Sequence, residues 1–148
     1  MRALFGEYAA GLDIDLSFQG FAAELDSLPG AYAPPRGAIL IADSGGRPCG
    51  CVAVRPLEGH ACEMKRLYVQ AQARGRGIGD RLVGRICALA REQGYAVMRL
   101  DTLASMTAAL QLYTRAGFRP IPAYLYNPIP DARYLALDLR EGAQTGHD

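Results

Sequence analysis

The sequence from Leu67 to Asp80 reads Leu-Tyr-Val-Gln-Ala-Gln-Ala-Arg-Gly-Arg-Gly-Ile-Gly-Asp. A strand-like apolar run comes first, a loop with glycine at three alternate positions follows, and an amphipathic helix begins where the loop ends. Glycine lets a ligand approach the backbone closely, and the first turn of a helix offers N–H groups and a partial positive charge. The stretch therefore predicts a cradle for an anion such as a pyrophosphate, with Arg74 and Arg76 adding positive charge.

Two other phosphate-binding motifs do not match this stretch. A P-loop has Lys and then Ser or Thr after its last glycine, and no Lys follows here. A dinucleotide-binding fingerprint is spaced Gly-x-Gly-x-x-Gly, whereas these glycines are Gly75, Gly77 and Gly79. A helix entry without a ligand is the remaining alternative. Three glycines between arginines argue against it, because each glycine costs stability in a helix.

Before residue 67, the pattern predicts two helices and then an antiparallel meander. Apolar residues at helical spacing predict helices over 2–12 and 18–27, and Pro and Gly predict a loop over 29–37. Apolar runs joined by turn-forming residues predict two successive hairpins. The predicted strands and turns are, in order, strand 38–42, turn 43–48, strand 49–55, turn 58–60 and strand 62–69.

After the glycine-rich loop, the pattern predicts a parallel crossover. A helix is expected over about 76–93 with Gly94 as its C-cap, and a second over 105–116 closed by Gly117. The order strand, long helix, strand, helix implies a parallel strand pair. The remaining predicted segments are strand 97–100, strand 134–139 and a tail over 141–148. The predicted fold is α/β (α+β): a single domain over 1–148 whose mixed central sheet has an antiparallel N-terminal meander, a parallel central pair and flanking helices.

Composition and charge narrow the classes of partner. The chain has 148 residues, of which 50% are hydrophobic and 21% charged, with a formal net charge of +1. Such a chain can bury a core without disulfides, and its charge gives no field that would attract nucleic acid or an anionic membrane. It contains no apolar run of the roughly 20 residues that span a bilayer. Residues 1–7 lack the layout of a secretion signal. The expected location is the cytoplasm.

The four cysteines have two interpretations. In a reducing compartment, they are expected to be small buried hydrophobic residues. Alternatively, Cys49-x-Cys51 and His60-x-Cys62 make a four-ligand set of the zinc type. Structural zinc pairs are usually spaced more widely and lie on turns, whereas these pairs border strand-like runs. No metal is therefore expected.

Two motifs resemble the GNAT superfamily of N-acetyltransferases. Arg74 to Gly79 fits the signature Arg/Gln-x-x-Gly-x-Gly/Ala, and the apolar lead-in of residues 67–69 fits as well. The run Ala109 to Phe118 reads Ala-Leu-Gln-Leu-Tyr-Thr-Arg-Ala-Gly-Phe, like the family's helix that ends in Tyr-x-x-x-Gly-Phe. The order and separation of the two motifs also agree. The resemblance covers about residues 38–139.

The resemblance implies acetyl-CoA as co-substrate and no metal. In that family, the glycine-rich loop holds the CoA pyrophosphate through backbone N–H groups. The preceding strand bulges away from its neighbour, and its backbone pairs with the pantetheine arm. Carried over to this sequence, the cofactor-binding residues are Leu67, Val69, Arg74, Gly75, Arg76, Gly77, Ile78 and Gly79.

Two catalytic residues are implied by position. Tyr113 matches the family's tyrosine near the CoA sulfur, where a phenol can protonate the departing thiolate; alternatively, it is only a core residue of its helix. Glu63 is near the position of a catalytic glutamate in some members and would accept a proton from the acceptor amine. Otherwise it pairs with Lys65 or an arginine at the sheet edge. Strand alternation places Glu63 and Lys65 on one face with Leu67 and Val69.

The acceptor is expected to be a primary amine of a small molecule or an amino-acid-like compound. Candidate substrate residues are Gln19, Phe21, Tyr124, Tyr126 and Asn127, with loop packing as the alternative interpretation. A CoA-binding module without turnover and an acetyltransferase for proteins or peptides remain rival functions. Because GNAT domains often pair, a homodimer is also implied.

The sequence departs from the family pattern in two places. Many relatives have asparagine seven residues before the tyrosine, where this chain has Met106. This difference puts one side-chain contact to the cofactor in doubt. Many relatives also begin with a strand before the first helix, whereas a helix is predicted here from residue 2. If so, either the first strand is missing from this chain or its sheet is shorter than the sheet of those relatives.

Overall fold

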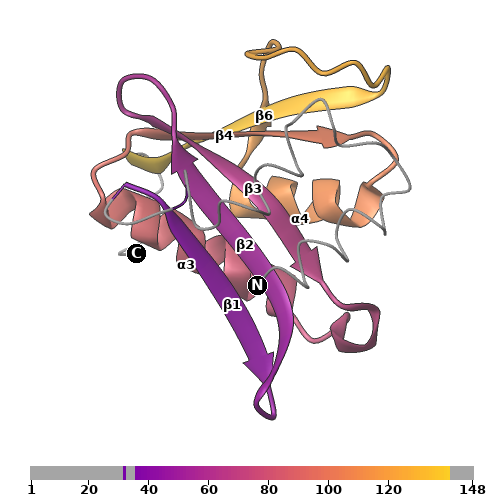
Figure 1. Cartoon of the computed structure of the whole chain (residues 1–148). Helices are drawn as coiled ribbons and strands as arrows, with labels where there is room; N and C mark the ends of the chain where they lie inside the picture. Colours follow the sequence, from indigo (N-terminus) through magenta and orange to yellow (C-terminus); the bar gives the residue numbers. More distant parts are fainter. Residues whose placement is uncertain (1–31, 33–35, 141–148) are drawn as a thin grey trace.

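A computed structural model describes Tyr32 and residues 36–140. The predicted helices over 2–12 and 18–27, with Gln19 and Phe21, and the predicted tail lie outside the described residues. One six-stranded mixed sheet runs through the described part, in the order β1-β2-β3-β4-β6-β5 (Figure 1). Its strands are β1 (Ala38–Ser44), β2 (Arg47–Pro56), β3 (Ala61–Val69), β4 (Val97–Leu103), β5 (Arg119–Pro120) and β6 (Ala132–Asp138).

The predicted meander and crossover are both confirmed. β1, β2 and β3 pair antiparallel in sequence order, and β3 pairs parallel with β4. The chain between β3 and β4 forms α3 (Ile78–Glu92), with Gly94 at a φ of 91° just beyond its end. Strand β4 extends to Leu103, past its predicted end, because all seven of its residues pair with β6. The two-residue strand β5 is not predicted, because a pair that short leaves no periodic pattern.

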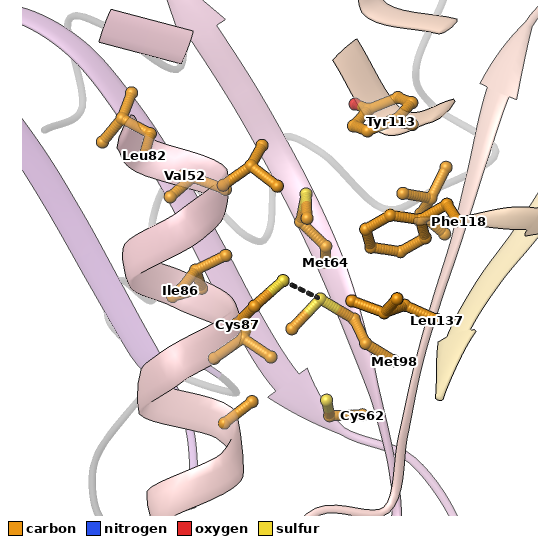
Figure 2. Packing of buried hydrophobic residues seen from close by; sticks show 14 of the residues in the cluster. Val52, Cys62, Met64, Leu82, Ile86, Cys87, Met98, Tyr113, Phe118 and Leu137 are labelled. Carbon is orange, nitrogen blue, oxygen red and sulfur yellow. Dashed lines mark hydrogen bonds between the residues drawn. The ribbon is translucent and has the colours of Figure 1, made fainter. Parts of the chain in front are cut away.

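Two helices pack on the same face of the sheet. Helix α3 and helix α4 (Thr107–Ala116) contribute to one hydrophobic cluster and lie behind the sheet in Figure 1. Figure 2 shows the middle of this core, where the Cys87 thiol contacts the sulfur of Met98 at 3.9 Å. The helices approach closely at Gly79, where a Cβ atom would lie 2.8 Å from Leu112 Cδ1. Within the described part of the chain, neither helix is long and apolar enough to cross a membrane.

Strand β3 carries a bulge that overturns one prediction. Lys65 pairs with Ala53 and Tyr68 with Cys51, so two residues of β3 face one of β2. Arg66 takes a φ of 61°, the left-handed region that non-glycine residues enter at a β-bulge. The extra residue shifts the alternation by one position. Tyr68, rather than Leu67, therefore shares the face of Lys65.

The residues around the bulge divide accordingly between two clusters. Leu67 and Val69 pack against the main core on the side of α3 and α4. Tyr68 packs with Cys51 and Ala53 on the opposite face. The predicted grouping of Glu63 and Lys65 with Leu67 and Val69 is therefore wrong.

The sheet register also argues against the four-ligand zinc set. Cys51 lies opposite Tyr68, whereas Cys62 lies opposite Pro56, five positions further along β2. At about 3.4 Å per residue, these positions are about 17 Å apart, too far for one ion to bridge. All four cysteines are buried and unoxidised, which agrees with their interpretation as small core residues.

Candidate active site

The parallel strands part soon after they begin to pair. Their pairing involves only Ala61–Glu63 of β3 and Val97–Arg99 of β4. Beyond it, β4 stays with β6, and β3 continues through its bulge toward the glycine-rich loop. A groove of about 570 Å³ lies between the end of β3, that loop and the start of α4. The described residues that line it are Leu67, Tyr68, Val69, Ala73, Arg74, Gly75, Gly77, Ile78, Gly79, Asp80, Ser105, Met106, Thr107, Ala108, Ala109, Leu112 and Arg115.

The glycine-rich loop has the backbone shape expected of an anion cradle. After a single 3-10 turn, η3 (Ala71–Ala73), Gly75 takes a φ of 84° and Gly77 a φ of 75°. Gly77 is the N-cap of α3, and its carbonyl accepts the Arg81 N–H. A Cβ atom at Gly75 or Gly77 would meet no protein atom within 4 Å. These glycines are therefore required by positive φ and leave the backbone open to a ligand.

A second helix begins on the same groove. Five residues around the start of α4, Ser105 to Ala109, line the groove. Met106 is the N-cap of α4, and its side chain makes no capping hydrogen bond. Both helices thus direct their positive ends toward one space, which favours a negatively charged group there.

The side chains of the two arginines in the loop point to different sides of it. Arg74 lines the groove, donates from Nε to the Val69 carbonyl at 2.9 Å and stacks over the Tyr68 ring. Arg76 instead reaches the opposite side of the loop, where it donates to Ser44 Oγ at 3.4 Å and lines a hollow beside β1. The side chain of Arg74 is therefore the better placed of the two for an anion in the groove.

A surface ion pair between two residues that line the groove joins the two helices. Arg115 donates to both carboxylate oxygens of Asp80, at 3.1 and 3.2 Å. Both side chains are more than half exposed, so this pair contributes less than about 1 kcal/mol to stability. Asp80 also lies in the first turn of α3, where a negative charge favours the helix.

Glu63 lies at the last paired position before the strands part. Its side chain is 0% exposed, and both carboxylate oxygens have partners. Arg55 Nε donates to Oε1 at 2.8 Å from the neighbouring strand, and the Tyr124 hydroxyl donates to Oε2 at 2.6 Å. The alternative interpretation, in which Glu63 pairs with an arginine, is thus observed, and that arginine is Arg55 of β2, a strand inside the sheet.

Other polar side chains near Glu63 lie on the same face of the sheet, opposite α3. Asn127 donates from its amide to Asp101 Oδ2 at 2.9 Å, and its oxygen accepts the Ile129 N–H. Lys65 lies two positions after Glu63 on β3, where it pairs with Ala53 of β2. Burial lowers the pKa of the Lys65 ammonium, although the nearby Glu63 carboxylate opposes that effect.

The remaining predicted residues occupy different settings. Tyr113 is 7% exposed and packs against Phe118 with ring centroids 5.7 Å apart, at the α4 end of the core (Figure 2). It does not line the groove, whereas its neighbour Leu112 does. Tyr126 is 80% exposed at the surface. Of the predicted substrate residues that the structure describes, Tyr124 alone contacts a predicted catalytic residue.

Two features of the site are absent from the sequence prediction. Arg55 faces Glu63 because the hairpin is symmetrical about Gly59. Counting outward from the turn at 58–60 pairs the two residues, so the signal was present in the sequence. The contribution of α4 to the groove had a signal as well, since Ser105 to Ala109 lie at a predicted helix start.

Known proteins resemble this chain in sequence and in fold. Residues 35–120 match the family model described as "Acetyltransferase (GNAT) domain". An uncharacterized N-acetyltransferase of Schizosaccharomyces pombe is 41% identical over 140 residues, which cover 93% of this chain and 86% of that protein.

Two solved structures share the fold. A crystal structure from Klebsiella pneumoniae, described as an acyl-CoA N-acyltransferase, superposes with a TM-score of 0.68 at 31% identity, over 82% of this chain and 86% of the other. A GNAT family acetyltransferase of Elizabethkingia anophelis with acetyl-CoA bound superposes with a TM-score of 0.60 at 22% identity, over 69% and 76%.

Proposed function

Because this chain belongs to the GNAT family of acetyltransferases, we propose that it transfers an acetyl group from acetyl-CoA to a primary amine. The acceptor in this proposal is a small molecule or an amino-acid-like compound, which attacks directly in a ternary complex. The groove carries the proposal, since two helix N-termini and a loop with two glycines at positive φ converge on it. That arrangement suits the pyrophosphate of an extended cofactor.

The groove residues fit CoA in shape as well as in charge. The cradle side chains at Gly75 and Gly77 are hydrogen atoms, and a β-carbon there would project into open space. Leu67 and Val69 lie past the bulge, where β3 no longer follows β4, and their backbone is proposed to pair with the pantetheine arm. Bound in this way, acetyl-CoA supplies an activated thioester.

Two residues of this chain would each take part in one proton transfer. Glu63 is proposed as the final base, because its buried carboxylate accepts two hydrogen bonds and lies where the strands part. Tyr113 is proposed as the acid that protonates the departing thiolate. Its neighbours Leu112 and Ala109 line the groove, which supports this assignment.

The rival functions make different predictions about turnover. A CoA-binding module would bind acetyl-CoA in the same groove without needing the buried polar network around Glu63. The buried Arg55–Glu63–Tyr124 arrangement therefore favours a catalyst. A protein or peptide acetyltransferase would use the same chemistry on a larger acceptor.

The test is CoA release from acetyl-CoA, followed with a thiol reagent, in the presence of a panel of acceptors. The panel contains glycine, lysine, tyramine, spermidine and short peptides with free N-termini. Release that depends on a small amine supports the proposal, and release only with the peptides moves the acceptor to that class. Binding of acetyl-CoA without release for any acceptor would favour the binding module.

A further inference from the structure

The carboxylate of Glu63 is closed off from any acceptor. None of its side chain is exposed, Oε1 accepts from Arg55, and Oε2 accepts from Tyr124. An amine could touch this carboxylate only by displacing one of two charge-assisted hydrogen bonds. Tyr124, by contrast, is only partly buried. The group that meets the acceptor is therefore one of the residues around Glu63.

We propose that Tyr124 is a catalytic residue that carries the proton of the acceptor amine to Glu63. This inference rests on the proposed acetyl transfer and changes how the base is reached. The hydroxyl of Tyr124 already donates to Glu63 Oε2 at 2.6 Å, a short bond for an O–H donor and a carboxylate. The phenol oxygen keeps a lone pair with which it can accept another proton.

The Tyr124 ring is held in place from two sides. It packs edge-on against the Tyr134 ring of β6, with centroids 5.8 Å apart. The guanidinium of Arg99 lies over its face at 5.8 Å. Tyr134 also donates from its hydroxyl to the Leu125 carbonyl, which anchors the segment between β5 and β6. The Tyr124 hydroxyl needs such a fixed position, because it must lie within hydrogen-bond distance of both the acceptor nitrogen and the Glu63 carboxylate.

The proton steps balance without any further reactant. The acceptor enters as an ammonium, and one of its N–H protons passes to the Tyr124 oxygen before the nitrogen attacks the acetyl carbonyl carbon. The phenol's own proton passes at the same time to Glu63 Oε2, so the phenol ends neutral and the carboxyl is protonated. The C–S bond breaks and Tyr113 protonates the leaving thiolate. The second proton that the nitrogen loses as the amide forms restores the Tyr113 phenol through solvent, and Glu63 releases its proton to solvent before the next turnover.

The surroundings of the pair keep the Tyr124 phenol protonated before the transfer. Burial raises the pKa of the Tyr124 phenol well above its usual value, and the negative charge of Glu63 raises it further. The phenol therefore stays protonated until the carboxylate takes its proton. Arg55 donates to the other carboxylate oxygen, Oε1, and leaves Oε2 to the phenol. Among the described residues, the charged and titratable groups that face the pair are Arg55 on β2, Lys65 on β3, Arg99 and Asp101 on β4, and Tyr134 on β6.

The test compares Tyr124→Phe with Tyr134→Phe, using the primary amine of the panel that gives the fastest CoA release. Phenylalanine keeps the Tyr124 ring and removes only the relaying hydroxyl. We expect kcat/KM near pH 7 to fall about 100-fold, within the usual range for a general acid or base, while acetyl-CoA affinity is unchanged. The loss should shrink as the pH rises toward about 10, where an alkyl amine loses its proton to solvent.

Tyr134→Phe is the matched control. It removes a hydrogen bond that anchors the same segment and leaves the contact between Tyr124 and Glu63 intact. If it reproduces both the loss and the changed pH profile, the segment's position matters rather than the Tyr124 hydroxyl, and the relay is overturned. A wild-type rate and profile in Tyr124→Phe would also overturn it.

A double-substitution cycle provides a second measurement. Glu63→Gln should lower kcat/KM, and adding Tyr124→Phe should lower it little further, because members of one relay act as a unit. Additive losses would contradict the relay. If the wild-type protein releases no CoA with any amine, the proposed function fails and the relay with it. A normal rate in Tyr124→Phe removes the relay alone.

Discussion

Gly77 allows a sharp test of the anion cradle, because its backbone and its surroundings impose different constraints. Its φ of 75° suits glycine, whereas a side chain there costs roughly 1–2 kcal/mol and a β-branched one more. Inside the protein a Cβ atom would meet nothing within 4 Å. Gly77→Val therefore strains the helix start and projects a branched side chain into the space where a ligand would approach.

The expected losses follow from these two effects. If the displaced helix start forfeits one hydrogen bond to a charged phosphate, about 1.5–3 kcal/mol of binding is lost, or roughly 10- to 150-fold in affinity for acetyl-CoA. The strain should lower the melting temperature by about 2–8 °C in a chain of this length. The affinity is measured by calorimetry below the melting temperature of the variant.

Gly84→Val is the matched control for that experiment. Gly84 lies on the exposed side of the same helix, has no positive φ, and has no protein atom within 4 Å of an added Cβ. The same substitution there should leave acetyl-CoA affinity unchanged, because valine is no worse than glycine inside a helix. Wild-type affinity in Gly77→Val, or equal weakening in both variants, would show that the loop is not the cradle.

Three further outcomes are expected. Tyr113→Phe should lower turnover about 100-fold with acetyl-CoA affinity retained, and unchanged CoA release would remove Tyr113 from the mechanism. Met106→Asn should stabilise α4 by about 1 kcal/mol, because asparagine can cap a helix whose N-cap residue makes no side-chain hydrogen bond. The melting temperature should rise by about 2–4 °C, and a melting curve without that rise would contradict the prediction. Burial raises the pKa of Cys62 to about 12 and of Cys87 to about 11, so at pH 8 neither forms appreciable thiolate. Mass spectrometry should find both unalkylated by iodoacetamide until the chain is denatured, and rapid alkylation of the folded protein would refute this.

Local sequence patterns were sufficient for most of the sheet and for the glycine-rich loop. The turn signals at 43–48 and 58–60 predicted the two hairpins, although the first turn is only residues 45–46 because 43, 44, 47 and 48 pair as strand residues. The change from strand to helix spacing after residue 75 predicted the crossover. Each of these signals lies within a few residues of the structure it determines. The same is true of the family motifs at Gly77 and Tyr113.

The bulge in β3 could not be predicted from alternation. The strand ends in three successive apolar residues, Leu67, Tyr68 and Val69. The alternation pattern therefore does not determine which of them face α3 and which face the opposite side. The contact of Tyr124 with Glu63 joins residues 61 positions apart. It depends on how the segment before β6 crosses the sheet, and no periodic pattern encodes that path.

The extra residue in β3 also determines where the protein can be redesigned. Positions 67 and 68 lie next to each other in sequence but act on opposite faces of the sheet. A library aimed at the face of Lys65 would vary Tyr68 with it, whereas changes at Leu67 would alter the packing of the main core. Deleting Arg66 would remove the bulge and move each of the side chains at positions 67 and 68 to the opposite face of the sheet. Substitutions at the neighbouring positions cannot reproduce that change.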